Sequence, residues 1–236
     1  MFRIDRSERN PNLISIMTGF TCNLSCTLCG PDASSKWQDE LKEYMPPQDN
    51  DLYDTAIADF TGATSVTFGG GEPVLNKSTI PLLKKIDSST AVNIHFNCTI
   101  LPSKELLDEC SRFKNITFIL SIDDTEERFE FLRYPAKWDK AVTNIHWMLE
   151  HCPTNIQYSI NTVISKLNEH TYHTVGEWVH ANIAADRINY IGTQDSNGIL
   201  NVQNSTVPDE ADWLDRLDTR RKTNWRETFP LATNIN

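Results

Sequence analysis

The stretch Ile116-Thr-Phe-Ile-Leu-Ser-Ile122 decides the fold class of this 236-residue chain, because it is almost continuously apolar. A strand of this composition is typical of a parallel sheet in which both faces are covered. Short apolar runs recur on either side of it, and longer runs with helical periodicity separate them. This alternation predicts right-handed βαβ units around a parallel sheet.

Six strands and several helices are expected from the same pattern. The expected strands are residues 13–17, 65–68, 92–96, 116–122, 156–162 and 188–191. The expected helices are residues 35–44, 52–60, 81–86, 103–113, 138–149 and 172–179, with one amphipathic helix after Val207. Six units fall short of the eight in a closed barrel. We therefore predict a partial (β/α)6 TIM-type barrel in residues 1–204 and a C-terminal helical tail in residues 205–236, with a doubly wound sheet as the alternative.

The charge balance argues against two classes of partner. The 22 basic and 32 acidic residues give a net charge of −10, which disfavours a global electrostatic grip on nucleic acid or on an anionic membrane. No apolar run approaches the roughly 20 residues of a membrane span, and the charged start does not resemble a secretory signal. We expect a cytoplasmic protein that binds neither membrane nor nucleic acid.

The motif with the strongest chemical meaning is Cys22-Asn-Leu-Ser-Cys26-Thr-Leu-Cys29, a C-x3-C-x2-C cluster directly after the first strand. Clustered cysteines in a reducing compartment favour a metal site over disulfides. Three thiolates are one short of a closed zinc or iron–sulfur site. Either a distant ligand such as His95 or Cys98 completes a structural zinc site, or a [4Fe–4S] cluster keeps one iron open to substrate.

A second motif, Gly69-Gly-Gly-Glu72-Pro73, follows the second expected strand. In combination with the cysteine motif it resembles the radical S-adenosylmethionine family, and the similarity extends from about Leu13 to Ile191. Three later segments are similar to the branch with SPASM or twitch extensions. They are Ser121-Ile-Asp-Asp, Phe131-Leu-Arg-Tyr-Pro-Ala-Lys-Trp and Tyr158-Ser-Ile-Asn-Thr-Val. No cysteine follows Cys152, so the cysteine-rich C-terminal module of that branch is not expected.

The resemblance implies an enzyme that cleaves S-adenosylmethionine reductively with a [4Fe–4S] cluster. The resulting 5′-deoxyadenosyl radical would abstract hydrogen from a substrate, which the family likeness suggests is a peptide or protein. An external one-electron donor, flavodoxin- or ferredoxin-like, is also implied. Two alternatives stay open: a non-catalytic, cluster-bearing subunit that serves a partner, and a structural zinc-binding protein.

The resemblance also assigns site residues. Cys22, Cys26 and Cys29 would ligate the cluster. Gly70 and Gly71 would let the backbone approach the methionine moiety, and Glu72 would accept a hydrogen bond from its ammonium group. Leu28 would lie beside the adenine, and Ile191-Gly192 after strand six would border it. The other cofactor-binding candidates lie on or after the strands: Asn97, Ser121, Asp123, Ser159 and Asn161. Of these, Ser121 and Asn161 would contact the ribose hydroxyls or the methionine carboxylate.

Two further segments of the sequence are rich in charged residues. The acidic segment after residue 122 is expected to be a loop on the active-site face, either solvated or suited to a basic peptide. Its acidic residues are Asp123, Asp124, Glu126, Glu127 and Glu130. Arg128, Arg133 and Tyr134 are candidates for substrate contact, unless Phe129 and Phe131 clamp the loop onto the barrel. Arg220-Arg221-Lys222 is typical of a helix face or of a helix C-terminus whose dipole favours basic residues, with contact to nucleic acid as the minor alternative.

Overall fold

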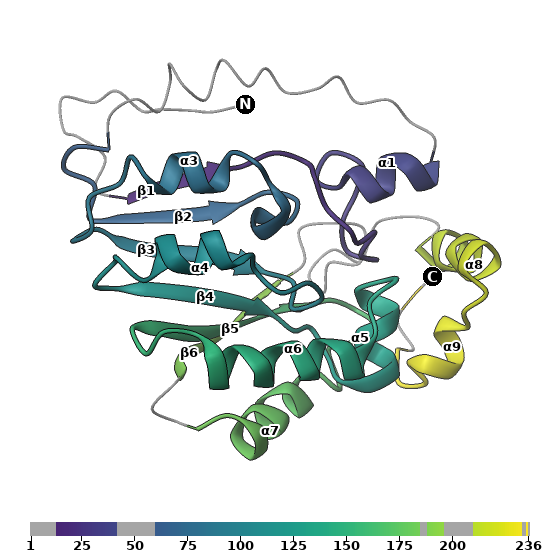
Figure 1. Cartoon of the computed structure of the whole chain (residues 1–236). Helices are drawn as coiled ribbons and strands as arrows, with labels where there is room; N and C mark the ends of the chain where they lie inside the picture. Colours follow the sequence, from purple (N-terminus) through teal and green to yellow (C-terminus); the bar gives the residue numbers. More distant parts are fainter. Residues whose placement is uncertain (1–12, 42–59, 185–187, 196–209, 233–234, 236) are drawn as a thin grey trace.

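The structure is a computed structural model that describes residues 13–41, 60–184, 188–195, 210–232 and 235 (Figure 1). Six strands form one parallel sheet in chain order. They are β1 Leu13–Met17, β2 Ser65–Gly69, β3 Ala91–Phe96, β4 Ile116–Ser121, β5 Ile156–Ile164 and β6 Ile188–Asp195. Because each strand pairs with the next along the chain, the sheet has no point at which the strand order reverses, and the doubly wound alternative is wrong.

Helices connect the strands, and two of these connecting helices are additions to those expected from the periodicity. They are α1 Ser35–Leu41, the 3-10 helix η1 Pro73–Leu75, α3 Thr79–Leu83, α4 Lys104–Cys110, α5 Glu126–Leu132, α6 Trp138–His151, α7 His173–Asn182, α8 Glu210–Arg221 and α9 Trp225–Thr228. The helix expected over residues 52–60 and the domain boundary at 204/205 lie outside the described residues, apart from Phe60. Ser103 caps α4 as expected, because its side chain accepts a hydrogen bond from the Leu106 N–H at 3.1 Å.

The additions are the 3-10 helix η1 and the longer α5, which occupies the segment expected to be a loop. Glu126 and Glu127 lie in its first turn, where their negative charges favour the helix N-terminus. Phe129 and Leu132 are three residues apart and both fully buried, so one face of α5 packs into the protein. The two phenylalanines, Phe129 and Phe131, therefore anchor a helix rather than an irregular loop.

The two faces of the sheet differ in burial. Along β4, Ile116, Phe118 and Leu120 are fully buried, whereas the alternating residues Thr117 and Ser121 are only partly covered. Figure 1 shows α3, α4 and α6 in front of the sheet, and their apolar side chains join the main core with the buried strand residues. Both faces of β4 are covered as expected, but to different degrees, and the half-covered face is the inner side of an open barrel.

A second, smaller core joins the C-terminal helices to α5. It contains Phe131, Leu132, Leu167, Leu214, Trp225, Phe229 and Ala232. Figure 1 shows α8 and α9 in yellow beside α5 at one end of the sheet. The expected single C-terminal helix is two helices, because Lys222 has a left-handed φ of 57° after α8 and the Asn224 side chain caps α9.

None of the helices in the described part of the chain combines the length and apolar composition that a transmembrane segment needs.

Candidate active site

The three cysteines lie on one loop between β1 and α1, and all three have free, half-buried thiols. The backbone on both sides of Cys26 is fixed by residues more than 100 positions away. Ser25 N–H donates to the Tyr134 carbonyl at 2.8 Å, and Thr27 N–H donates to the Leu132 carbonyl at 2.7 Å. The Trp37 indole N–H donates to the Cys26 carbonyl at 2.8 Å. Tertiary contacts thus hold the path of the cysteine loop.

Burial raises the pKa of Cys22, Cys26 and Cys29, and electrostatic repulsion from the thiolate forms of the other two cysteines also raises the pKa of Cys26. Within the described ranges, no three His, Cys, Asp or Glu side chains are placed to hold a metal ion together. Binding of a metal by these thiols would release their protons.

The surroundings of Cys26 fit a charged inorganic group. The buried Ser25 hydroxyl and the buried Arg133 Nε have no hydrogen-bond partner among the described residues. The Arg133 charge also lowers the pKa of Cys26, against the larger effect of burial. Buried polar atoms without partners are rare in proteins and call for an explanation. Three free thiols on one loop beside a buried cation form a donor set that suits an iron–sulfur cluster with a net negative charge.

The glycine motif packs directly against the cysteine loop. Gly71 N–H donates to the Gly19 carbonyl and Glu72 N–H to the Thr21 carbonyl, each at 2.8 Å. A Cβ atom on Gly70 would lie 2.7 Å from the Gly19 carbonyl oxygen, and one on Gly71 would lie 2.8 Å from the Phe20 carbonyl. Gly70 also has a left-handed φ of 116°. Only glycine permits this close approach of the two loops.

Glu72 is buried where the two loops meet. Its Oε1 accepts the Val74 N–H at 3.2 Å, and its Oε2 accepts the Asn97 N–H at 2.8 Å. Burial raises the pKa of Glu72 to about 7, although both backbone hydrogen bonds lower it. A buried carboxylate that keeps its charge only at and above neutral pH is suited to receive a cationic ligand group.

Asn97 connects Glu72 to the cysteine loop. Besides its backbone N–H bond to Glu72, it donates from Nδ2 to the Asn23 side-chain oxygen at 2.9 Å. Asn23 in turn donates to the Thr99 hydroxyl at 2.8 Å, and Thr99 donates to the Asn97 Oδ1 at 2.7 Å. The side chain of Asn97 is therefore engaged by the protein, and it fixes the residue next to Cys22.

The candidates on β4 and β5 lie together on the inner face of the sheet. Ser121 and Asn161 are direct partners in the parallel register, and Ser159 lies two residues before Asn161 on the same face. All three are half-buried. The structure thus brings Ser121, Ser159 and Asn161 together, at the same sheet edge to which β3 delivers Asn97.

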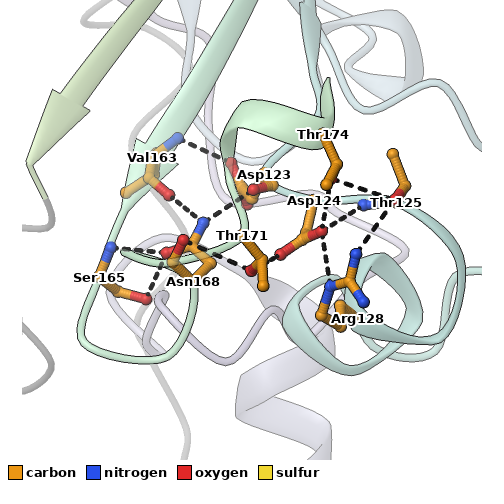
Figure 2. Close-up of polar contacts among 9 residues, drawn as sticks. All are labelled: Asp123, Asp124, Thr125, Arg128, Val163, Ser165, Asn168, Thr171 and Thr174. Atoms are coloured by element: carbon orange, nitrogen blue, oxygen red, sulfur yellow. Dashed lines mark hydrogen bonds and ion pairs between the residues drawn. The ribbon is translucent and has the colours of Figure 1, made fainter. Parts of the chain in front are cut away.

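Asp123 is held by the protein on three sides. Its carboxylate lies 2.9 Å from Arg133 Nη2 and accepts the Val163 N–H at 2.9 Å. Its carbonyl accepts a hydrogen bond from Asn168 Nδ2 at 2.7 Å. Figure 2 shows how Asn168, which also contacts Ser165, joins the loop after β5 to Asp123. Asp123 thereby orients Arg133, the cation beside Cys26.

The expectation of a solvated acidic run is wrong for its first two members. Asp124 is fully buried and accepts hydrogen bonds from Arg128 Nε at 2.8 Å and from the hydroxyls of Thr171 and Thr174 (Figure 2). Arg128 and Arg133 are thus partners of Asp124 and Asp123. These charges are neutralised internally and tie α5 to the segment before α7, so they offer no acidic surface to a peptide.

The structure places the adenine candidates Leu28, Ile191 and Gly192 as follows. Leu28 is half-buried and packs against the second core, next to the C-terminal helices, and its contact with adenine stays a prediction. Ile191 and Gly192 do not follow strand six as expected. They lie inside β6, which continues to Asp195 and pairs Gly192 with Asn161.

The sequence model of the Radical SAM superfamily matches residues 16–179, which is more than half of the chain. The chain belongs to the radical SAM superfamily of enzymes. The predicted recognition is confirmed, and the matched range contains both the cysteine motif and the glycine–glutamate motif. The superfamily implies a [4Fe–4S] cluster and S-adenosylmethionine as cofactors. No curated protein sequence matches the chain significantly.

Solved structures of radical SAM proteins have the same fold. Streptococcus suis SuiB bound to S-adenosylmethionine is 17% identical, with a TM-score of 0.59 over 91% of this chain and 46% of SuiB. SuiB bound to the precursor peptide SuiA is 18% identical, with a TM-score of 0.59 over 91% of this chain and 47% of SuiB. Native anSMEcpe with bound AdoMet is 14% identical, with a TM-score of 0.57 over 95% and 63%. The chain therefore spans about half the length of SuiB.

The sequence reasoning missed the supports of the site more than its core. Trp37, which holds the Cys26 carbonyl, carried no motif signal. Arg133 was assigned to substrate contact, but it is buried against Asp123. The only feature of the sequence that pointed to Arg133 is its position between Phe131 and Trp138, in a segment that resembles the family.

Gly71→Ala should destabilise the protein by about 1–3 kcal/mol, because the new methyl group would meet the backbone of Phe20 and Thr21. The free energy of unfolding in urea measures the effect. Gly176→Ala in α7 is the control, since no atom lies within 4 Å of its added Cβ and alanine favours the helix by about 0.5–1 kcal/mol. Equal effects of the two substitutions would contradict the close packing of the two loops.

Asp123→Ala should lower the free energy of unfolding by about 3–5 kcal/mol, because it leaves the Arg133 charge buried without its partner. Asp108→Ala is the matched control. It removes the exposed i,i+4 pair with Lys104, for which a change below about 1 kcal/mol is expected. A small effect at Asp123 would contradict the internal neutralisation of Arg133.

Glu72 should make the metal-free protein less stable as pH rises from about 4.5 to about 7. The folded state binds the Glu72 proton more tightly than the unfolded chain does. The contribution of this group to the free energy of unfolding is therefore complete below pH 4.5 and is lost as the pH rises through the pKa of the folded state. The interval corresponds to about 3 kcal/mol. Urea unfolding of wild type and Glu72→Gln between pH 5 and 8 isolates the effect. A difference between the two proteins that does not change with pH would contradict the raised pKa.

Proposed function

We propose that this chain is the catalytic domain of an enzyme that cleaves S-adenosylmethionine reductively and abstracts hydrogen from a peptide or protein substrate. Cys22, Cys26 and Cys29 would hold a [4Fe–4S] cluster. The main observation behind the proposal is that the cysteine motif and the glycine–glutamate motif are hydrogen-bonded to each other in one site. The Gly71 and Glu72 N–H groups bond to the cysteine loop, and Asn97 joins Glu72 to Asn23 beside Cys22.

The cluster would supply the single electron that breaks the carbon–sulfur bond of S-adenosylmethionine. The protein's own contribution begins with its thiols, whose pKa values are raised by burial. Binding iron must release their protons, so cluster binding is favoured as pH rises. The buried Arg133 beside Cys26 supplies positive charge close to the anionic thiolates.

Glu72 would bind the ammonium group of the methionine moiety. The Asn97 and Val74 N–H groups fix both of its oxygens, which leaves their remaining lone pairs for the ligand. A cation beside Glu72 favours its charged form and opposes the effect of burial. Ser121 and Asn161, adjacent on β4 and β5, would contact the ribose hydroxyls or the carboxylate. The glycine backbone would pack against the methionine chain.

A peptide or protein substrate is proposed because the structure of SuiB with its precursor peptide SuiA has the same fold. The reaction also needs an external one-electron donor, for which a flavodoxin- or ferredoxin-like protein is proposed. The free cysteines of the loop suit a reducing compartment such as the cytoplasm.

Anaerobic reconstitution followed by a cleavage assay tests the proposal. Wild-type protein should bind iron and sulfide, absorb broadly near about 400 nm, and form 5′-deoxyadenosine from S-adenosylmethionine after reduction. Cys26→Ala should lose the cluster and the product while it keeps the fold, as judged by circular dichroism. Cys110→Ala is the control, because Cys110 is buried in the main core on α4.

Three outcomes would contradict the proposal. Equal product from Cys26→Ala would remove the cysteine ligand set. Zinc in place of iron in the anaerobic protein would indicate a structural metal site. A stable cluster without any 5′-deoxyadenosine would leave the non-catalytic, cluster-bearing subunit as the better assignment.

A further inference from the structure

Arg221, at the end of α8, is buried although it belongs to a run of three basic residues. It lies in the last turn of its helix, as expected for a basic run at a helix C-terminus, but only 2% of its side chain is exposed. Its guanidinium pairs with Glu40 at 3.1 Å and lies 4.7 Å from the ring centroid of Trp37 and 4.5 Å from that of Tyr134. Arginine is rarely fully buried, and here an ion pair and two aromatic rings stabilise the buried charge at the end of the helix.

The hydrogen bonds of Arg221 end on the cysteine loop. Nη2 donates to the Ser25 carbonyl at 2.7 Å, and Nη1 donates to the Thr27 hydroxyl at 3.2 Å. Ser25 and Thr27 are the two residues that flank Cys26. One guanidinium therefore forms hydrogen bonds to the loop on both sides of Cys26, and only arginine has the planar group that allows this.

The two aromatic partners of Arg221 hold the same point of the loop. The Trp37 indole donates to the Cys26 carbonyl, and the Tyr134 carbonyl accepts the Ser25 N–H. Leu28 adds an apolar contact, because it packs against the second core with Leu214 of α8. These contacts make Arg221 the centre of a cluster that fixes the backbone at Cys26, and Glu40 balances its charge.

We propose that Arg221 is a positioning residue for Cys26, so that α8 forms part of the cluster site although it contributes no ligand. This inference rests on the proposed function for the role of the cluster. Its structural content concerns the loop alone: without Arg221 the segment 25–27 loses the hydrogen bonds from α8, and the backbone that carries Cys26 becomes less restricted.

The first experiment uses metal-free protein and measures the alkylation rate of each cysteine by iodoacetamide, with peptide mass mapping. Arg221→Ala should raise the rates at Cys26 and its two loop partners by roughly tenfold, because local opening of the loop becomes easier. The rate at Cys110, buried in the main core, should stay unchanged. Arg216→Ala is the matched control, since this arginine of α8 forms an ion pair with Asp212 and is 67% exposed.

Arg221→Lys provides the test of rescue. Lysine keeps the charge and its attraction to Glu40 but cannot form the paired hydrogen bonds to Ser25 and Thr27. We expect alkylation rates between those of wild type and Arg221→Ala. If Arg221→Ala does not fold, the lysine variant decides the same comparison against Arg216→Ala.

The second experiment uses protein reconstituted with iron and sulfide. Arg221→Ala should lose iron to a chelator roughly tenfold faster than wild type and Arg216→Ala, and the electron paramagnetic resonance spectrum of its reduced cluster should differ. If wild type binds no iron, the proposed function fails, and alkylation still decides the role of Arg221. Unchanged alkylation of the loop cysteines, or an equal rise at Cys110, would overturn the inference.

Discussion

The arrangement of the site depends on the hydrogen bonds that the buried carboxylate of Glu72 accepts. This carboxylate receives N–H groups from Val74 and Asn97, so it joins the loop after β2 to the end of β3. The residues before it bond to the backbone of the cysteine loop. Because burial removes water from this carboxylate, its two protein donors are worth more than they would be at the surface. A parallel sheet supplies the geometry, since it delivers every strand end to one edge.

The cysteine loop is supported from the opposite side by residues distant in sequence. Arg133 follows α5, and Arg221 ends α8; both lie next to Cys26 and both are paired with an acidic residue. The network around Asp124 fixes α5 itself, as Figure 2 shows. Ligand-bearing loops are often mobile, and this one is fixed by hydrogen bonds to its backbone carbonyls and amides.

The sequence predicted the sheet and the motifs well because both have local signatures. Apolar runs such as Ile116–Ile122 mark strands, and the spacing of Cys22, Cys26 and Cys29 is legible without a structure. The buried charges were not predictable in this way. Asp124 looks like part of a solvated acidic run, and Arg221 looks like a helix end. Their burial depends on partners that are distant in sequence, up to 196 positions for Arg221 and the Ser25 carbonyl, and such partners leave no periodic pattern.

The clamp between Arg221 and the Ser25 carbonyl spans 196 positions of the chain. During synthesis the cysteines leave the ribosome first, and α8 is the later partner. At about 5–20 residues per second, the cysteine segment waits roughly 10–40 s for Arg221. Throughout that interval the nascent loop has neither its arginine nor the α8 side of its apolar support. The backbone around Cys26 is therefore less restricted in the nascent chain than in the complete fold.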